Sequence, residues 1–287
     1  PIYVLFVPLN TKILTRRGWL SYDQVIPNVD ETIGYNQKLG KSQWTKIKNV
    51  FTYKDKEVIR ISNGTTTFET TPNHRWLAEK STRLWINGKH DKRIYVEEFV
   101  ETQNILQEHH LQLAKKFESD SKLDITDEEA AILGWAMSDG YIKVSPRTSI
   151  TAQGSQGQYQ AVRMEICQSV KNAKYVKEID SLLRNCKHTK DKPTKEGQIN
   201  WRISQPIGRD IIRRAGLLIK SGNYQETDPF KFVFSMSDSQ RFAFIRSIYY
   251  GDGVKGQPII CQNAGWLSKV ISIIGYLEGY VVRSVTN

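Results

Sequence analysis

The first part of the chain alternates hydrophobic and polar residues over short stretches. Clear examples are Lys12–Thr15, Glu57–Ile61 and Thr66–Thr70, and turn residues such as Asn63-Gly64 separate them. A period of two residues is typical of strands with one buried face. The pattern predicts an all-β domain over residues 1–118.

A second pattern begins after the polar segment Asp120–Asp124. Thr126 and Glu129 have the spacing of a capping box, which opens a helix. Strand-like and helix-like stretches then alternate. They are Ala161–Gln168 and Ile199–Ser204 as strands, and Ala173–Cys186 and Gly208–Leu218 as helices. We expect an α+β domain over residues 119–287, in the order helix, two strands, helix, two strands, helix.

Within this domain, Ile132–Gly140 and Ile245–Gly253 share one pattern, an apolar helical stretch that ends in Asp-Gly. Each stretch has two small residues four positions apart: Gly134 and Ser138 in the first, Ser247 and Gly251 in the second. Residues four apart lie on one helical face, where small side chains let two backbones approach. The repetition predicts that the two helices pack face to face.

The two motif acids, Asp139 and Asp252, come at the C-terminal ends of these helices, where the helix dipole disfavours a negative charge. Helix stability therefore does not explain them. Packing of the helices would bring them together as a carboxylate pair, which suits Mg²⁺. The alternative is that each Asp-Gly only ends a helix, with the glycine in a left-handed C-cap.

Similarity between the two halves extends beyond the motifs, because Ile166–Gln168 recurs 94 residues later as Ile260–Gln262. The motif acids are 113 residues apart, so the first repeat carries 19 extra residues. We place them in a surface loop within Ser145–Gln158. The repeats then span about 126–235 and 236–287, and we expect the second to lack its final strand and helix.

Composition adds a basic charge to this picture. The chain has 287 residues, with 41 Lys and Arg against 30 Asp and Glu, which gives a formal net charge of +11. Such a surplus favours a nucleic-acid partner. Three cysteines without C-x-x-C spacing indicate neither a disulfide framework nor a zinc site. No stretch has the form of a secretion signal or a membrane span, so we expect an intracellular protein that does not bind membranes.

The two Asp-Gly helices resemble the paired motifs of the LAGLIDADG homing endonucleases, in the double-motif, single-chain form. The resemblance implies that Asp139 and Asp252 bind divalent metal ions, Mg²⁺ or Mn²⁺. It also implies that Gln168, Gln262 and Lys220 contribute polar and basic groups to the same catalytic site. Two metal ions would then clamp the scissile phosphate during an in-line displacement.

Recognition of the DNA sequence would fall to the strands, whose alternate residues face one way. The candidates are the polar and basic residues Gln158, Gln160, Arg163, Lys190, Lys192, Lys195 and Arg202. We expect a monomer that binds a long specific site in double-stranded DNA.

Two segments of the N-terminal domain, Thr11–Thr15 and Thr71–His74, resemble the first two sequence blocks of the Hint fold of inteins. In that family a Cys or Ser five residues before the first-block Thr attacks its own preceding carbonyl. That position here is Phe6, and no Cys, Ser or Thr precedes Thr11. Phenylalanine has no nucleophile, and no His-Asn pair ends the sequence, so we expect a Hint-like domain that does not splice.

The predicted function is therefore a site-specific, metal-dependent endonuclease that cleaves double-stranded DNA. One alternative is a nucleic-acid-binding protein on the same scaffold without catalysis, such as a maturase or a regulator. Another is an intein whose splicing nucleophile has been replaced. An acid in each motif favours the nuclease over the binding protein, and Phe6 argues against splicing.

Overall fold

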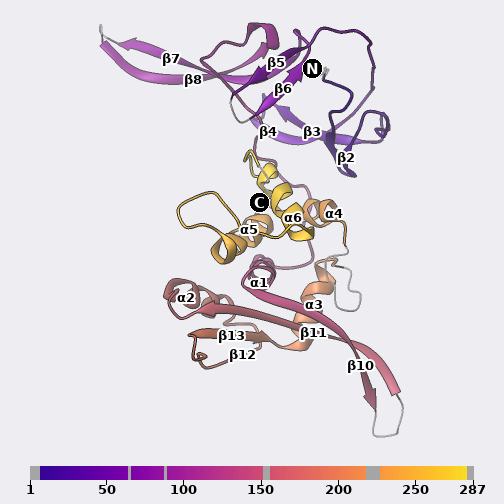
Figure 1. Cartoon of the computed structure of the whole chain (residues 1–287), viewed down its shortest axis with the longest axis vertical. Helices are drawn as coiled ribbons and strands as arrows, with labels where there is room; N and C mark the ends of the chain where they lie inside the picture. The colour runs from indigo at the N-terminus through magenta and orange to yellow at the C-terminus, as the bar shows by residue number, and fades with distance from the viewer. Residues whose placement is uncertain (1–6, 64–65, 87–88, 151–155, 218–226, 283–287) are drawn as a thin grey trace. The chain divides into compact units, whose positions relative to one another are not determined.

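The computed structural model describes residues 7–63, 66–86, 89–150, 156–217 and 227–282, which form helices and antiparallel sheets (Figure 1). They divide into two compact units. The N-terminal unit contains the described residues up to Phe117 together with Gly279–Val281. The second unit contains Glu118–Glu278 and Val282. The division between the two units falls between Phe117 and Glu118.

The N-terminal unit is built from antiparallel strands, so the prediction of a β-rich region is confirmed. Its sheets have the strand orders β2-β1-β3-β4, β5-β6 and β8-β7-β9. The elements are β1 (Ile13–Thr15), β2 (Gly18–Leu20), β3 (Glu31–Asn36), β4 (Lys41–Lys46), β5 (Ile59–Ser62), β6 (Thr67–Thr70), β7 (Arg75–Ile86), β8 (Lys89–Glu101), a 3₁₀ helix η1 (Thr102–Asn104) and β9 (His109–Leu111).

The tight hairpin between β1 and β2 has clear local causes. Gly18 has a φ of 102°, and the buried Thr15 hydroxyl donates a 2.9 Å hydrogen bond to its carbonyl oxygen. A positive φ of this kind favours glycine. Next to the turn, the Arg17 guanidinium donates two 2.7 Å bonds to the buried Asp30 carboxylate. This pairing lowers the pKa of Asp30 to about 2 and fixes the loop that leads into β3.

The second unit combines a four-stranded antiparallel sheet, β10-β11-β13-β12, with six helices among its described residues. Its elements are α1 (Asp127–Met137), β10 (Gly140–Ile150), β11 (Gln156–Ser169), α2 (Ala173–Leu182), β12 (His188–Lys190), β13 (Gln198–Ile203), α3 (Gln205–Arg214), α4 (Pro229–Phe234), α5 (Asp238–Asp252) and α6 (Trp266–Leu277). In the described part of the chain, no helix is long and apolar enough to cross a membrane.

The sheet of this unit has one covered face and one open face. Val162, Met164 and Ile166 of β11 are buried, and α3 approaches them closely because Gly208 has no side chain. A Cβ at Gly208 would lie 3.4 Å from the Met164 Cβ. The residues between them in β11 point to the opposite, open face. This alternation sets which side chains are available to a partner.

One expectation about the sheet is wrong. The segment Ser145–Gln158 was expected to be a surface loop, but β10 continues to Ile150 and β11 starts at Gln156. The strands pair in one uninterrupted register from Gly140↔Ile166 to Ile150↔Gln156. Its polar composition does not prevent pairing, because the ladder is made by backbone groups.

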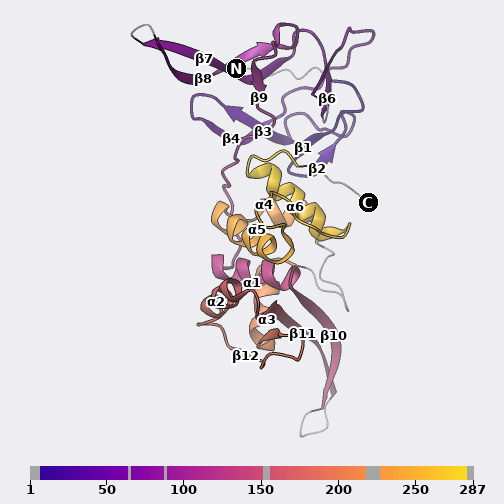
Figure 2. The same ribbon diagram turned by 60° about the vertical axis from the view of Figure 1, so that its left-hand side comes forward.

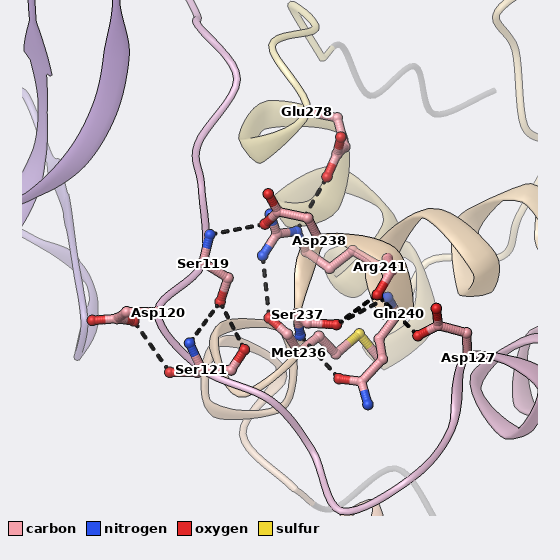
Figure 3. A network of polar contacts seen from close by, with 11 residues as sticks. Ser119, Asp120, Ser121, Asp127, Met236, Ser237, Asp238, Gln240, Arg241 and Glu278 are labelled. Carbon is pink, nitrogen blue, oxygen red and sulfur yellow. Dashed lines mark hydrogen bonds and ion pairs between the residues drawn. The ribbon is translucent and has the colours of Figure 1, made fainter. Parts of the chain in front are cut away.

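The segment that leads into α1 is bound to the start of α5 (Figure 3). Gln240 accepts a bond from the backbone N–H of Leu123 at 3.1 Å and donates to the carbonyl oxygens of Leu123 and Ile125 at 3.0 and 2.6 Å. The fully buried Arg241 donates to Asp238 at 2.6 Å and to Glu278 at 3.2 Å. These contacts give α1 and α5 a common polar anchor at their N-terminal ends.

Candidate functional site

The two motif helices, α1 and α5, pack face to face, as their small residues predicted (Figure 2). A Cβ at Gly134 would lie 2.5 Å from the Phe244 carbonyl oxygen and 2.9 Å from the Ser247 Cβ. A Cβ at Gly251 would lie 2.8 Å from the Ser138 Cβ. Gly134 and Ser247 occupy the same place in the two motifs, as do Ser138 and Gly251. Equivalent residues therefore meet each other, which is the arrangement of a local pseudo-twofold axis.

The two motif acids stand at the same end of this helix pair. Asp139 follows the C-cap residue of α1, and Asp252 is the last residue of α5. Neither following glycine has a positive φ, and Gly253 is extended with φ −83° and ψ 149°. The alternative of a left-handed glycine cap is therefore wrong. A Cβ at Gly140 would instead collide with the Glu165 carbonyl oxygen, so close backbone approach explains this glycine.

Each acid is held by a glutamine in the same way. Gln168 Nε2 donates to Asp139 Oδ2 at 2.7 Å, and Gln262 Nε2 donates to Asp252 Oδ2 at 2.8 Å. The backbone repeats as well, because the N–H that precedes each glutamine donates to the carbonyl oxygen of the acid. These bonds are 2.5 Å from Cys167 and 2.9 Å from Cys261. The structure thus brings together four of the five predicted catalytic residues.

Asp139 and Asp252 form a pair of acids that no basic side chain neutralises among the described residues. Burial raises the pKa of Asp139, and the Gln168 bond only partly offsets it. Burial also raises the pKa of Asp252, and the nearby charge of Asp139 raises it further. Neither acid forms an ion pair with a Lys or Arg among the described residues. Two partly buried, mutually repelling carboxylates fit a divalent cation.

The protein would supply only part of a metal's coordination shell. Among the described residues, no group of three or more His, Cys, Asp and Glu side chains is arranged to hold a metal ion. Mg²⁺ commonly keeps several waters and takes one or two carboxylates together with substrate phosphates. The pair at Asp139 and Asp252 fits this mode and not an all-protein cage.

The predicted DNA-binding residues do not all share one face. Arg163 and Arg202 lie on the open face of the sheet, where Arg163 is two residues from Glu165 in β11 and Arg202 is the partner of Glu165 in β13. Lys190 does not, because it pairs in register with the buried Trp201 and donates to Asp180 of α2 at 2.7 Å. The side chain thus points to the covered face. Lys192 and Lys195 are exposed in the turn between β12 and β13.

Some predicted residues lie outside this description. Lys220 is not among the described residues, and neither is Phe6. Gln158 and Gln160 belong to β11, but their side chains lie outside what the structure describes.

Two residues of the site were not predicted. Asn172 donates to Gln168 Oε1 at 2.7 Å, and the Ser169 N–H donates to the same atom at 2.8 Å. These bonds turn the Gln168 amide so that its nitrogen faces Asp139. Glu165 is the second, a nearly buried acid on the open sheet face. Its one sequence signal is a carboxylate two residues from Arg163 in a strand, a spacing that puts both on one face.

In the N-terminal unit, the segment Thr71–His74 forms a turn. The His74 N–H donates to the Thr71 carbonyl oxygen at 3.1 Å, and the His74 carbonyl accepts from the Thr102 N–H at 2.8 Å. His74 is buried, and this burial lowers its pKa. Its ring meets that of Trp76 edge-on, with the centroids 4.9 Å apart. The burial favours the neutral form of the imidazole.

Comparison with known proteins gives structural matches only. No protein-family model matches the chain, and no curated protein matches its sequence. Structures of mesophilic variants of the homing endonuclease I-DmoI match 52% of this chain and 75% of theirs, with 14% identity and a TM-score of 0.33. I-DmoI in complex with DNA and Ca matches 52% of this chain and 70% of its own, with 15% identity and a TM-score of 0.32.

A second homing endonuclease, I-CvuI in complex with its target and Ca, gives a weaker match. It covers 54% of this chain and 98% of its own, with 12% identity and a TM-score of 0.24. None of these matches identifies the N-terminal unit. The chain is thus similar to LAGLIDADG homing endonucleases over about half its length. At this low identity the matches assign no role to individual residues.

Proposed function

We propose that the second unit is a metal-dependent endonuclease that cleaves double-stranded DNA at a specific site. The observation that carries this proposal is the duplicated Asp–Gln pair at the tips of α1 and α5. A helix interface alone does not need two acids at the dipole-disfavoured ends of both helices. The raised pKa values of both acids support the proposal, because perturbed titratable groups cluster at functional sites.

In this proposal the chain's residues have separate tasks. Asp139 and Asp252 hold the metal, and Gln168 and Gln262 fix the orientation of one oxygen of each carboxylate. Mg²⁺ or Mn²⁺ bound there would lower the pKa of a coordinated water and neutralise charge on the phosphate. The exposed arginines on the open sheet face contact the DNA, and the protein acts as a monomer, since one chain supplies both acids.

The test uses Asp139→Asn and Asp252→Asn, with Glu128→Gln as the control. Glu128 is exposed near the other end of α1, so its variant removes the same charge from the same helix. The substrate is a fragmented genomic library or supercoiled plasmid carrying a selected site, with Mg²⁺ or Mn²⁺. Each Asn variant should lose more than the roughly 10–100-fold that loss of an outer-shell partner costs, while DNA binding persists.

Metal binding is measured separately by thermal unfolding. Mg²⁺ should raise the melting temperature of the parent and of Glu128→Gln, because a ligand that binds only the folded state stabilises it. It should have no effect on the double Asn variant. A parent that binds DNA without cutting it, and shows no Mg²⁺ shift, would instead be the non-catalytic binding protein.

We also propose that the N-terminal unit is a Hint-like domain without splicing activity. The support is its β-rich architecture, the tight Thr71–His74 turn and the absence of a nucleophile at Phe6. The test expresses the chain between two flanking reporter domains. Phe6→Cys is the variant that restores a nucleophile, and its readout is thiol-induced release of the N-terminal reporter. A ligated reporter product from the parent would contradict the proposal.

A further inference from the structure

Glu165 is an unusual residue on the open face of the β10–β13 sheet. Its side chain is only 5% exposed, although Arg163 and Arg202 beside it are 60% and 46% exposed. Burial of a carboxylate is unfavourable unless charged groups and hydrogen bonds surround it. A negative charge on a face that binds DNA also opposes the phosphates. General affinity for DNA therefore does not explain a glutamate at position 165.

The two arginines bind the same oxygen of Glu165. Arg163 Nε donates to Glu165 Oε1 at 2.6 Å, and Arg202 Nε donates to it at 3.0 Å. The register places Tyr141, Glu165 and Arg202 in one row across β10, β11 and β13. Burial is the main cause that raises the pKa of the Tyr141 phenol, and the hydrogen bond to Glu165 and the Glu165 charge raise it further.

The two guanidinium groups differ in the donors that remain. Arg202 Nη2 is 2.6 Å from Asp191 Oδ2, so the Arg202 guanidinium is paired with one carboxylate at Nε and with another at Nη2. Arg163 uses Nε alone, and its terminal nitrogens have no acceptor among the described residues. Its guanidinium carbon lies 5.2 Å from the centroid of the Tyr141 ring, which restrains it from another direction. Arg163 thus keeps its terminal N–H donors on a side chain that is 60% exposed and is held at Nε.

We propose that Arg163 reads a guanine in the DNA major groove and that Glu165 is the positioning residue that aims it. Two parallel donors match the O6 and N7 acceptors of guanine, and this bidentate pair is the commonest specific contact between an arginine and a base in the major groove. Holding the side chain through Nε reduces the entropy that is lost when the contact forms. This inference rests on the proposed function, because it specifies the DNA that the second unit recognises.

The experiment selects preferred sequences from a randomised duplex library and then measures affinity for selected and scrambled duplexes over a range of salt. Three variants are compared with the parent: Glu165→Gln, Arg163→Lys and Lys143→Gln. Lys143 is the control, because it lies opposite Arg163 in the register, is exposed and has no carboxylate partner in the described part of the chain. All four proteins are checked by circular dichroism.

Glu165→Gln should bind scrambled DNA more tightly, since one negative charge is removed, and yet lose about 10-fold of its preference for guanine at one position. Arg163→Lys should keep its affinity for scrambled DNA and lose the same preference. Lys143→Gln should keep the preference and reduce the salt slope by about 1. A merely structural Glu165 would lower both affinities together.

Two results would overturn the inference. One is a guanine preference that survives Arg163→Lys, and the other is an equal loss of both affinities in Glu165→Gln. These outcomes leave the proposed function intact, because the parent still binds DNA. A parent that binds no DNA would contradict the proposed function and this inference together.

Discussion

The two repeats of the second unit reach the same acid geometry from different amounts of structure. In the first, Asp139 leads into β10, and Gln168 lies near the end of β11 in a four-stranded sheet. In the second, the described residues after Asp252 make one isolated bridge, Gly253↔Ile260. The Asp–Gln bonds nevertheless differ by only 0.1 Å, at 2.7 and 2.8 Å.

The difference between the two repeats shows that placing the acids and forming a DNA-binding face need different amounts of structure. A helix tip, one close backbone approach and one short bridge are enough to place an acid and its glutamine. The face that would contact DNA needs a full sheet, because Tyr141, Glu165 and Arg202 come from three strands. Acid placement is therefore a local property, and the recognition surface is a tertiary one.

The largest effect should come from the polar anchors at the N-terminal ends of the motif helices. Arg241 is fully buried between Asp238 and Glu278, whereas Arg214, 20% exposed, binds Glu129 of the first repeat. Arg241→Met removes the buried cation that Asp238 and Glu278 share and should reduce the free energy of unfolding by about 3 kcal/mol. Arg214→Met should cost about 1 kcal/mol. Urea unfolding measures both, and equal losses would show that the anchors do not differ.

The helix interface gives the next prediction, because equivalent positions carry different residues. Gly134→Ala places a Cβ 2.5 Å from a backbone oxygen that cannot move cheaply, so it should destabilise the unit by about 1–3 kcal/mol. This loss should exceed the gain of about 1 kcal/mol in helix propensity. Ser247→Ala keeps its Cβ and loses only a 3.1 Å bond within its own helix, so it should be nearly neutral. A stabilising Gly134→Ala would contradict the close packing.

Asn172 tests whether the two half-sites act independently. Gln168 Oε1 accepts from Asn172 and Ser169, whereas Gln262 Oε1 accepts from the Asn263 N–H at 3.1 Å. Asn172→Ala should slow cleavage of one DNA strand by about 10-fold and leave the other unchanged. The variant removes a hydrogen bond that orients Gln168, and with it Asp139, but does not touch Gln262. Strand-resolved cleavage of end-labelled duplexes measures this, and equal slowing of both strands would show that the half-sites are coupled.

The smallest effect concerns pH. Because the folded state raises the pKa of Asp252, the ionised carboxylate opposes folding above that pKa, and the penalty disappears below the ordinary Asp value of about 3.9. Asp252→Asn should therefore raise the melting temperature at pH 7 and have no effect near pH 3. Glu129→Gln is the control of opposite sign, since Arg214 lowers the pKa of Glu129. It should destabilise at pH 7, and this loss should fade as the pH falls.

Much of the arrangement could be predicted from the sequence because its causes are local. The capping box at Thr126, the small residues on the motif helices and the repeated Ile-Cys-Gln segment depend on spacing along the chain. These features predicted the α1–α5 contact and the paired acids, and the alternation of hydrophobic and polar residues predicted the β-rich N-terminal unit. The resemblance of the motifs to a known family implied that both glutamines belong to the same site as the acids.

Only the tertiary structure decided which polar residues share a face and which partners they have. Lys190 has the composition of a DNA contact, but its register with Trp201 turns it towards Asp180. The extended β10–β11 hairpin occupies a segment whose polar residues suggested a loop. Glu165 has a second arginine partner, Arg202, which is 37 residues away in sequence. Register, strand order and burial depend on long-range contacts, which residue spacing does not encode.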